Sequence, residues 1–182
     1  MKNEYDIIII GAGPAGSSAA LFADKIGLNS VLLDKSYFPR DKICGDALSG
    51  KSVKYMQDLN ILDDVKKLQG STINRILFGS PSHKIIDINL AKSQDLSKIS
   101  SGFVIPRKEF DNYLINKAKN VTEVKEGFKV KDILYDNNRV IGVEGLQEQN
   151  LIKLYAPLLL VCDGANSGIS RKLNLYKYDT KN

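Results

Sequence analysis

The sequence predicts a protein of the α/β class, with a parallel sheet and an antiparallel, strand-rich insertion. Three observations near the start of the chain lead to this prediction. An apolar run ends at Ile10, the glycine-rich segment GAGPAG and a stretch of small residues follow it, and a second apolar run ends at Asp34. The two runs and the segment between them span about 30 residues, the usual length of a strand–helix–strand unit.

The first three elements follow from residue types. The run from Tyr5 to Ile10 has no polar alternation, which is typical of a strand buried on both faces of a parallel sheet. Pro14 falls in the first turn of the next helix, where its missing N–H costs nothing, and Gly27 marks the end of that helix. The second strand is expected at Ser30 to Asp34.

The remaining elements are expected from periodicity and turn residues. In chain order they are a long ordered loop at 37–50, a helix at 52–67 broken near 60, strands at 73–78, 84–90 and 102–106, a helix at 107–120, strands at 128–135, 139–146 and 151–155, and an apolar strand at 156–162. Phe110, Leu114 and Ala118 share one helical face. The triplet 136–138, Asp-Asn-Asn, is a suitable hairpin turn. The polar tail at 176–182 is expected to form no further element.

Composition narrows the class of protein. The chain has 182 residues, enough for one good core or two small ones. Its net charge of +5 is spread along the chain, whereas a nucleic-acid-binding face usually concentrates basic residues. Two distant cysteines and one histidine argue against a disulfide framework, a metal site and a histidine-based triad. No apolar run is long enough to span a bilayer and no secretory signal is evident, so a cytoplasmic protein is expected, with peripheral membrane contact left open.

The glycine-rich segment predicts a dinucleotide site. Gly11 allows a tight turn, Gly13 lets a pyrophosphate approach the backbone, and Gly16 permits close packing of helix on strand. The start of the helix offers free N–H groups to the phosphates. Asp34 is placed to bond the hydroxyls of an adenosine ribose and would repel a 2′-phosphate there. The candidate contacts in this region are Gly11, Gly13, Pro14, Ala15, Gly16, Asp34 and Lys35.

This Rossmann-like fingerprint alone does not choose between FAD and NAD. Three later segments do: FPRDKICGD at 38–46, Pro-Arg at 106–107, and CDGANS at 162–167. Together with the first motif, they resemble the flavoprotein superfamily with the p-hydroxybenzoate hydroxylase fold. Within it, the segment at 38–46 resembles the geranylgeranyl reductase family most. The resemblance covers essentially the whole chain and implies that the cofactor is FAD.

The resemblance implies roles for residues outside the first motif. Arg40 or Lys42 would neutralise a phosphate, and the backbone of Cys44 and Gly45 would lie near the isoalloxazine. Arg107 would reach the cofactor from the start of a helix. The remaining candidates are Asp163 and Gly164, expected at the pyrophosphate, and Val130, expected to contact adenine through its backbone.

Each of these roles has a simpler alternative. Arg40 and Lys42 could be solvated loop charges, and Arg107 could merely serve a helix end. Asp163 could cap a helix starting at Ala165, since aspartate is a preferred N-cap residue. Cys44 is the single catalytic candidate; Lys42 would lower the pKa of its thiol and Asp46 would oppose that effect, so its reactivity cannot be predicted.

Relatives of this kind are much longer, so the predicted FAD-binding domain over 1–182 is incomplete relative to the family. Only the start of a substrate-side insertion, at about 70–106, is expected. The chain is therefore expected to be a fragment or a natural truncation. The implied activity is reduction of isoprenoid double bonds by a flavin, with electrons from NAD(P)H or another donor, on a small-molecule or lipid substrate. The alternatives are a flavin-dependent aromatic hydroxylase or halogenase, and a non-catalytic FAD-binding fragment; oligomeric state is left open.

Overall fold

The computed structural model describes residues 4–48, 50–90 and 102–173. Contacts between residues divide the chain into two compact units. The first, which we call the sheet unit, consists of Met1–Arg40 and Asp111–Asn182, and the second, the inserted unit, is Asp41–Phe110. The expected tail at 176–182 lies outside the described residues.

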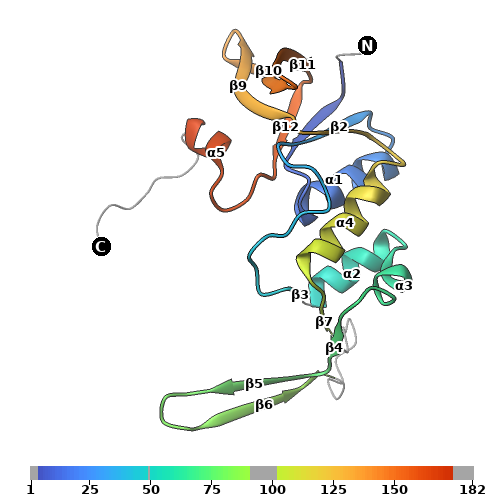
Figure 1. The fold of residues 1–182 in the computed structure, drawn as a ribbon, viewed down its shortest axis with the longest axis vertical. Coiled ribbons are helices and arrows are strands. Elements are labelled where there is room, and N and C mark those ends of the chain that lie inside the picture. The colour runs from blue at the N-terminus through green and yellow to red at the C-terminus, as the bar shows by residue number, and fades with distance from the viewer. Residues whose placement is uncertain (1–3, 49, 91–101, 174–182) are drawn as a thin grey trace. The chain divides into compact units, whose positions relative to one another are not determined.

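A four-stranded parallel sheet forms the centre of the sheet unit (Figure 1). Its strands, in spatial order, are β12 (Leu158–Val161), β1 (Ile7–Ile10), β2 (Ser30–Asp34) and β8 (Glu123–Glu126). Ile7 pairs with Ser30 on one side and with Leu158 on the other. The predicted parallel sheet is confirmed, and all the carboxyl ends of its strands lie at one edge.

Strand β1 contributes to two hydrophobic cores because successive side chains of a strand point to opposite faces. Ile7 and Ile9 pack with helix α1 (Pro14–Lys25) and with Ile115 of helix α4 (Arg107–Ala118). Ile8 and Ile10 pack on the other face. Side chains from an antiparallel sheet of β9 (Lys129–Asp136), β10 (Arg139–Gln147) and β11 (Asn150–Tyr155) pack in the same core, and so does Ile169 of helix α5 (Gly168–Lys172).

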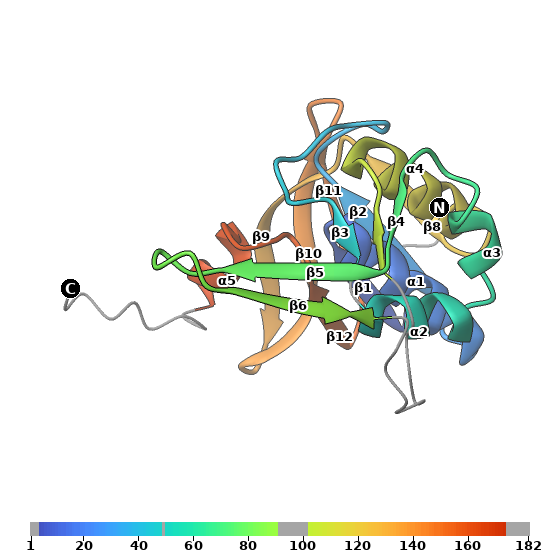
Figure 2. The same ribbon diagram turned by 90° about the horizontal axis from the view of Figure 1, so that it is seen from below.

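The inserted unit contains two short helices and two small sheets. Its elements are α2 (Gly50–Asp58), α3 (Leu62–Val65), a three-stranded sheet of β3 (Ala47–Leu48), β7 (Gly102–Val104) and β4 (Ser71–Ile73), and a hairpin of β5 (Arg75–Gly79) and β6 (Ile85–Asn89). Figure 2 shows β5 and β6 side by side along their length. Buried apolar side chains such as Val53, Met56 and Phe103 come from α2 and β7.

Most predicted elements are present, with instructive differences. The helix expected at 52–67 is two helices separated by Asn60, which adopts a left-handed backbone (φ 56°) where the break was expected. The strand expected at 73–78 is interrupted at Asn74, so that β4 and β5 join different sheets. The loop expected at 37–50 holds the short strand β3, because residues 47–48 pair with β7.

Strand β8 was not predicted from the sequence. Its four residues read Glu-Val-Lys-Glu, and only the valine contributes to a hydrophobic core. Glu123 accepts a hydrogen bond from the Tyr5 hydroxyl, and Glu126 accepts one from the Phe38 backbone N–H. Polar contacts therefore hold this edge strand in place, and hydropathy does not reveal them. No helix in the described part of the chain is long and apolar enough to cross a membrane.

The bond between Tyr5 and Glu123 predicts a specific dependence of stability on pH. Burial and the hydrogen bond to Glu123 raise the pKa of Tyr5. Its contribution to stability is therefore fully present below the unfolded tyrosine pKa of about 10 and declines as the pH rises above that value. We expect Tyr5→Phe to cost about 1 kcal/mol at neutral pH, because one partner, Glu123, is half exposed.

Urea unfolding at neutral pH and at a pH above that of the unfolded tyrosine measures this effect. The difference between wild type and Tyr5→Phe should shrink at the higher pH. A difference that stays constant over this range would contradict the assigned bond. Tyr135→Phe, at an exposed strand position, is the matched control.

Candidate dinucleotide-binding site

The glycine loop joins β1 to α1 at the carboxyl edge of the parallel sheet. Gly11 has a positive φ of 99°, and a Cβ atom on it would lie 2.5 Å from the carbonyl oxygen of Cys162. A Cβ atom on Gly16 would collide with the carbonyl oxygen of Gly11. Both glycines are therefore required by close packing between backbone segments, as their places in the motif predict.

The start of α1 is open to an anion. Gly13 precedes the helix, Pro14 begins it, and none of the described side chains caps it through a hydrogen bond. No acidic residue lies in its first turn. The backbone N–H groups in the first turn of this 12-residue helix, at the positive end of its dipole, therefore remain available for a phosphate. Ala15 lies in this first turn.

Asp34 ends β2 and is buried, with 7% of its surface exposed. One carboxylate oxygen, Oδ2, accepts a hydrogen bond of 2.7 Å from the N–H of Ala12 in the glycine loop. The other, Oδ1, accepts one of 2.8 Å from the N–H of Ser36. Asp34 thus fixes the glycine loop and the segment that follows β2. A carboxylate has about four lone-pair sites, so capacity remains for the ribose hydroxyls of the sequence-based prediction.

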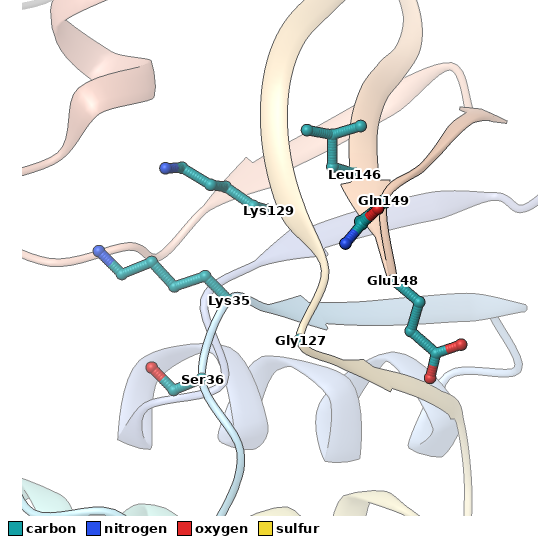
Figure 3. Close-up of a pocket in the computed structure, with 7 residues that line it drawn as sticks. All are labelled: Lys35, Ser36, Gly127, Lys129, Leu146, Glu148 and Gln149. Carbon is teal, nitrogen blue, oxygen red and sulfur yellow. The ribbon is translucent and has the colours of Figure 1, made fainter.

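The two residues that follow Asp34 in the sequence line a pocket of about 580 Å³ (Figure 3). It is lined by Lys35, Ser36, Gly127, Lys129, Leu146, Glu148 and Gln149. The side chains of Lys35 and Lys129 extend in the same direction, while Glu148 points away from them (Figure 3). Val130, the neighbour of Lys129, is partly buried and packs its side chain against the core.

Asp163 and Gly164 follow β12, the parallel neighbour of β1, and so reach the same edge as Gly11. The Cα atom of Asp163 lies 2.9 Å from where a Cβ atom on Gly11 would be. Oδ1 of Asp163 is buried and has no hydrogen-bond partner among the described groups. Buried carboxylate oxygens are normally bonded, so Oδ1 of Asp163 is an acceptor at this edge that a ligand hydroxyl could satisfy.

The alternative role of Asp163 as a helix cap is wrong. Helix α5 begins at Gly168, and its N-cap is Ser167, whose hydroxyl accepts a hydrogen bond of 2.8 Å from the N–H of Ser170. The segment from Gly164 to Asn166 is a turn rather than a helix, and Gly164 has a positive φ of 94°. Asp163 and Ser167 are both good N-cap residues and stand four positions apart, and it is Ser167 that caps the helix.

Arg40 also belongs to the sheet unit, where it forms an ion pair with Asp111 of α4, with 3.3 Å between Nη1 and Oδ2. The other candidates belong to the inserted unit. These are Lys42, Cys44, Gly45 and Arg107. The candidates thus form one group in each unit. In the described part of the chain, no cluster of three or more histidine, cysteine or acidic side chains could hold a metal ion.

Cys44 is exposed and lies close to Arg107. The backbone N–H of Asp46 and the side chain of Arg107, followed by the N–H of Gly45, lower the pKa of the Cys44 thiol. The lysine expected to have this effect, Lys42, is not among the causes. The guanidinium comes from the start of α4, about 60 residues further along the chain, which is why the sequence did not reveal the pairing.

Comparisons with known proteins agree with this geometry. A family model described as "FAD binding domain" matches residues 4–181. A menaquinone reductase from Mycolicibacterium smegmatis is 30% identical over 177 residues, which cover 95% of this chain and 41% of the relative. Digeranylgeranylglycerophospholipid reductase 2 from Methanopyrus kandleri is 27% identical over 174 residues, 94% of this chain and 40% of the relative.

Among solved structures, the flavin-dependent brominase Bmp2 matches with a TM-score of 0.81 and 27% identity, covering 93% of this chain and 40% of that one. The chain therefore spans about two fifths of the length of the relatives it matches.

The role of Asp34 in the ligand-free protein can be tested by Asp34→Asn. The amide keeps the shape of the side chain, but its NH₂ group cannot accept either backbone N–H. One buried donor is then left unsatisfied, at a cost of about 1–3 kcal/mol. Urea unfolding without any nucleotide measures the loss, with Asp24→Asn at the exposed end of α1 as the matched control. Equal stability of the two variants would exclude the loop-fixing role.

The environment of Cys44 predicts how its reactivity depends on pH. Alkylation by iodoacetamide should reach half its maximal rate at a pH below the free cysteine value of about 8.5. Arg107→Met should move that midpoint upward, because it removes one of the groups that lower the pKa. Burial raises the pKa of the other cysteine, Cys162, so a Cys44→Ser variant should label slowly. An unchanged midpoint in Arg107→Met would contradict the contact.

Proposed function

The chain belongs to the family of FAD-binding domains, and on this premise we propose that it is the cofactor-binding part of a flavin-dependent reductase of isoprenoid double bonds. The observation that carries the cofactor assignment is the edge where the uncapped start of α1, the carboxylate of Asp34 and the unpartnered Oδ1 of Asp163 meet. These groups match the phosphates and hydroxyls of FAD in kind. The reductase assignment is supported by similarity to two reductases and by the segment PRDKICG.

Different residues at this edge would bind different parts of FAD. The N–H groups at the start of α1 would bind the pyrophosphate. Asp34 would accept hydrogen bonds from the adenosine ribose, and the pocket beside Lys35 and Lys129 would take the adenine end. Oδ1 of Asp163 would accept from a hydroxyl of the cofactor, which removes its unsatisfied state. When bound, FAD supplies the hydride chemistry, while the protein supplies binding and orientation.

The inserted unit would serve the reacting end of the cofactor. The N–H groups of Asp46 and Gly45 and the guanidinium of Arg107 face the Cys44 thiol and lower its pKa. The backbone of Cys44 and Gly45 would then lie near the isoalloxazine, as the family resemblance implies. An isoprenoid lipid substrate would bring this protein to a membrane surface, and NAD(P)H is the reductant we propose.

A second candidate is a flavin-dependent halogenase or aromatic hydroxylase. The similarity to the brominase Bmp2 favours it, because that structure shares the fold and 27% of the sequence. The two functions differ in whether reduced flavin passes its electrons to a double bond or to oxygen. Anaerobic bleaching of bound flavin by NADPH supports the reductase, whereas strict dependence of NADPH oxidation on an aromatic substrate supports the hydroxylase.

FAD binding by the purified chain is the direct test of this proposal. We expect the chain to take up added FAD and to show the visible absorption band of bound flavin. Asp34→Ala should weaken FAD binding at least about tenfold, because the ribose hydroxyls lose a charged acceptor and the glycine loop loses its anchor. Asp24→Ala, at the other end of α1, is the matched control. A chain that stays colourless after incubation with FAD would refute the proposed function.

A further inference from the structure

Arg40 and Asp111 mark the two points at which the chain crosses between its units. The polypeptide leaves the sheet unit after Arg40 and re-enters it at Asp111. The side chains of these two residues form an ion pair, with 3.3 Å between Nη1 and Oδ2. The two crossing segments, 71 residues apart in sequence, are thus joined by this contact within the sheet unit.

This ion pair is largely buried, so it belongs to the folded interior and is not an exposed surface contact. The carboxylate of Asp111 is fully buried, and the side chain of Arg40 is 19% exposed. A carboxylate removed from water in this way needs a charged or hydrogen-bonding partner, and loss of that partner is strongly destabilising. The guanidinium carbon of Arg40 also lies 4.6 Å from the centre of the Phe38 ring. Phe38 itself packs against the core shared by β1 and α1.

The rest of this segment is held in the same manner, by carboxylates of different elements. Asp34 of β2 accepts the N–H of Ser36, and Glu126 of β8 accepts the N–H of Phe38 at 2.7 Å. Glu126 is itself paired with Lys119 at 2.8 Å. Asp111 of α4 is the third carboxylate and holds the last residue of the segment. The segment 36–40 therefore has a fixed course directly after the residue proposed to bind ribose.

We propose that Arg40 is a positioning residue whose guanidinium is committed to Asp111, and that it is not a ligand of the cofactor phosphates. This inference rests on the proposed function only for its statement about FAD. If Arg40 does not bind the phosphates, their negative charge is balanced by the start of α1 and by other cationic side chains. Arg40 acts indirectly, because it fixes the segment that follows Asp34 and Lys35.

A double-mutant cycle tests the pair. In the protein without FAD, Arg40→Met removes the cation that pairs with the buried carboxylate of Asp111 and should lower the melting temperature by roughly 10 °C. Asp111→Leu should lower it less, because the freed arginine can still reach solvent. The double variant, Arg40→Met with Asp111→Leu, should recover at least half of the loss from Arg40→Met. Arg75→Met, in the exposed pair with Asp87, is the matched control and should change the melting temperature by less than about 2 °C.

FAD affinity, measured well below the melting temperatures, separates positioning from direct contact. Arg40→Met should weaken FAD binding, and the double variant should restore it to within about threefold of wild type, with the same dependence on salt. A double variant that is stable but binds FAD about tenfold or more weakly, with a shallower salt dependence, would overturn the proposal. Strictly additive melting temperatures would overturn it as well. If wild type binds no FAD, the proposed function fails, and the melting temperatures alone still decide whether the two residues are coupled.

Discussion

The carboxylate of Asp34 is the interaction on which the arrangement of the candidate site depends. Its two oxygens bond to the N–H of Ala12 and the N–H of Ser36, so one side chain fixes the loop after β1 and the segment after β2. A glycine-rich loop is flexible in isolation because glycine has many allowed conformations. A buried charged acceptor at the end of the neighbouring strand selects one of them. The site is therefore preorganised before any ligand binds.

The layers of the sheet unit bring that interaction about. Strand β1 is apolar on both faces, and each face enters a separate core, so its position and direction are fixed. The parallel registers with β2 and β12 then bring the ends of three strands to one edge. Gly11 lies where a side chain would strike the backbone at Cys162, which allows the first and last strands of the site to approach closely.

The sequence predicts the parts of this structure that depend on local pattern. The strand–helix–strand unit, the hairpin at Asn137 and Asn138, and the break at Asn60 follow from periodicity and turn residues, and all three are observed. Strand β8 could not be predicted, because charged side chains and polar contacts hold it rather than an apolar face. Contacts between residues far apart in the sequence could not be predicted either. The pairing of Arg40 with Asp111 spans 71 residues, and the pocket depends on a turn at Glu148 and Gln149.

The central position of β1 has a consequence for the order in which this protein can fold. Its two neighbours differ greatly in sequence distance: β2 follows within one supersecondary unit, whereas β12 pairs with β1 across about 150 residues. Closing so long a loop is slow and gains nothing until the late strand is available. During synthesis, the glycine loop can meet Asp34 early, but its contact with Cys162 and Asp163 must wait for the ribosome to release β12. Until then one edge of β1 has unpaired backbone N–H and C=O groups, and such an edge can pair with a strand of another chain.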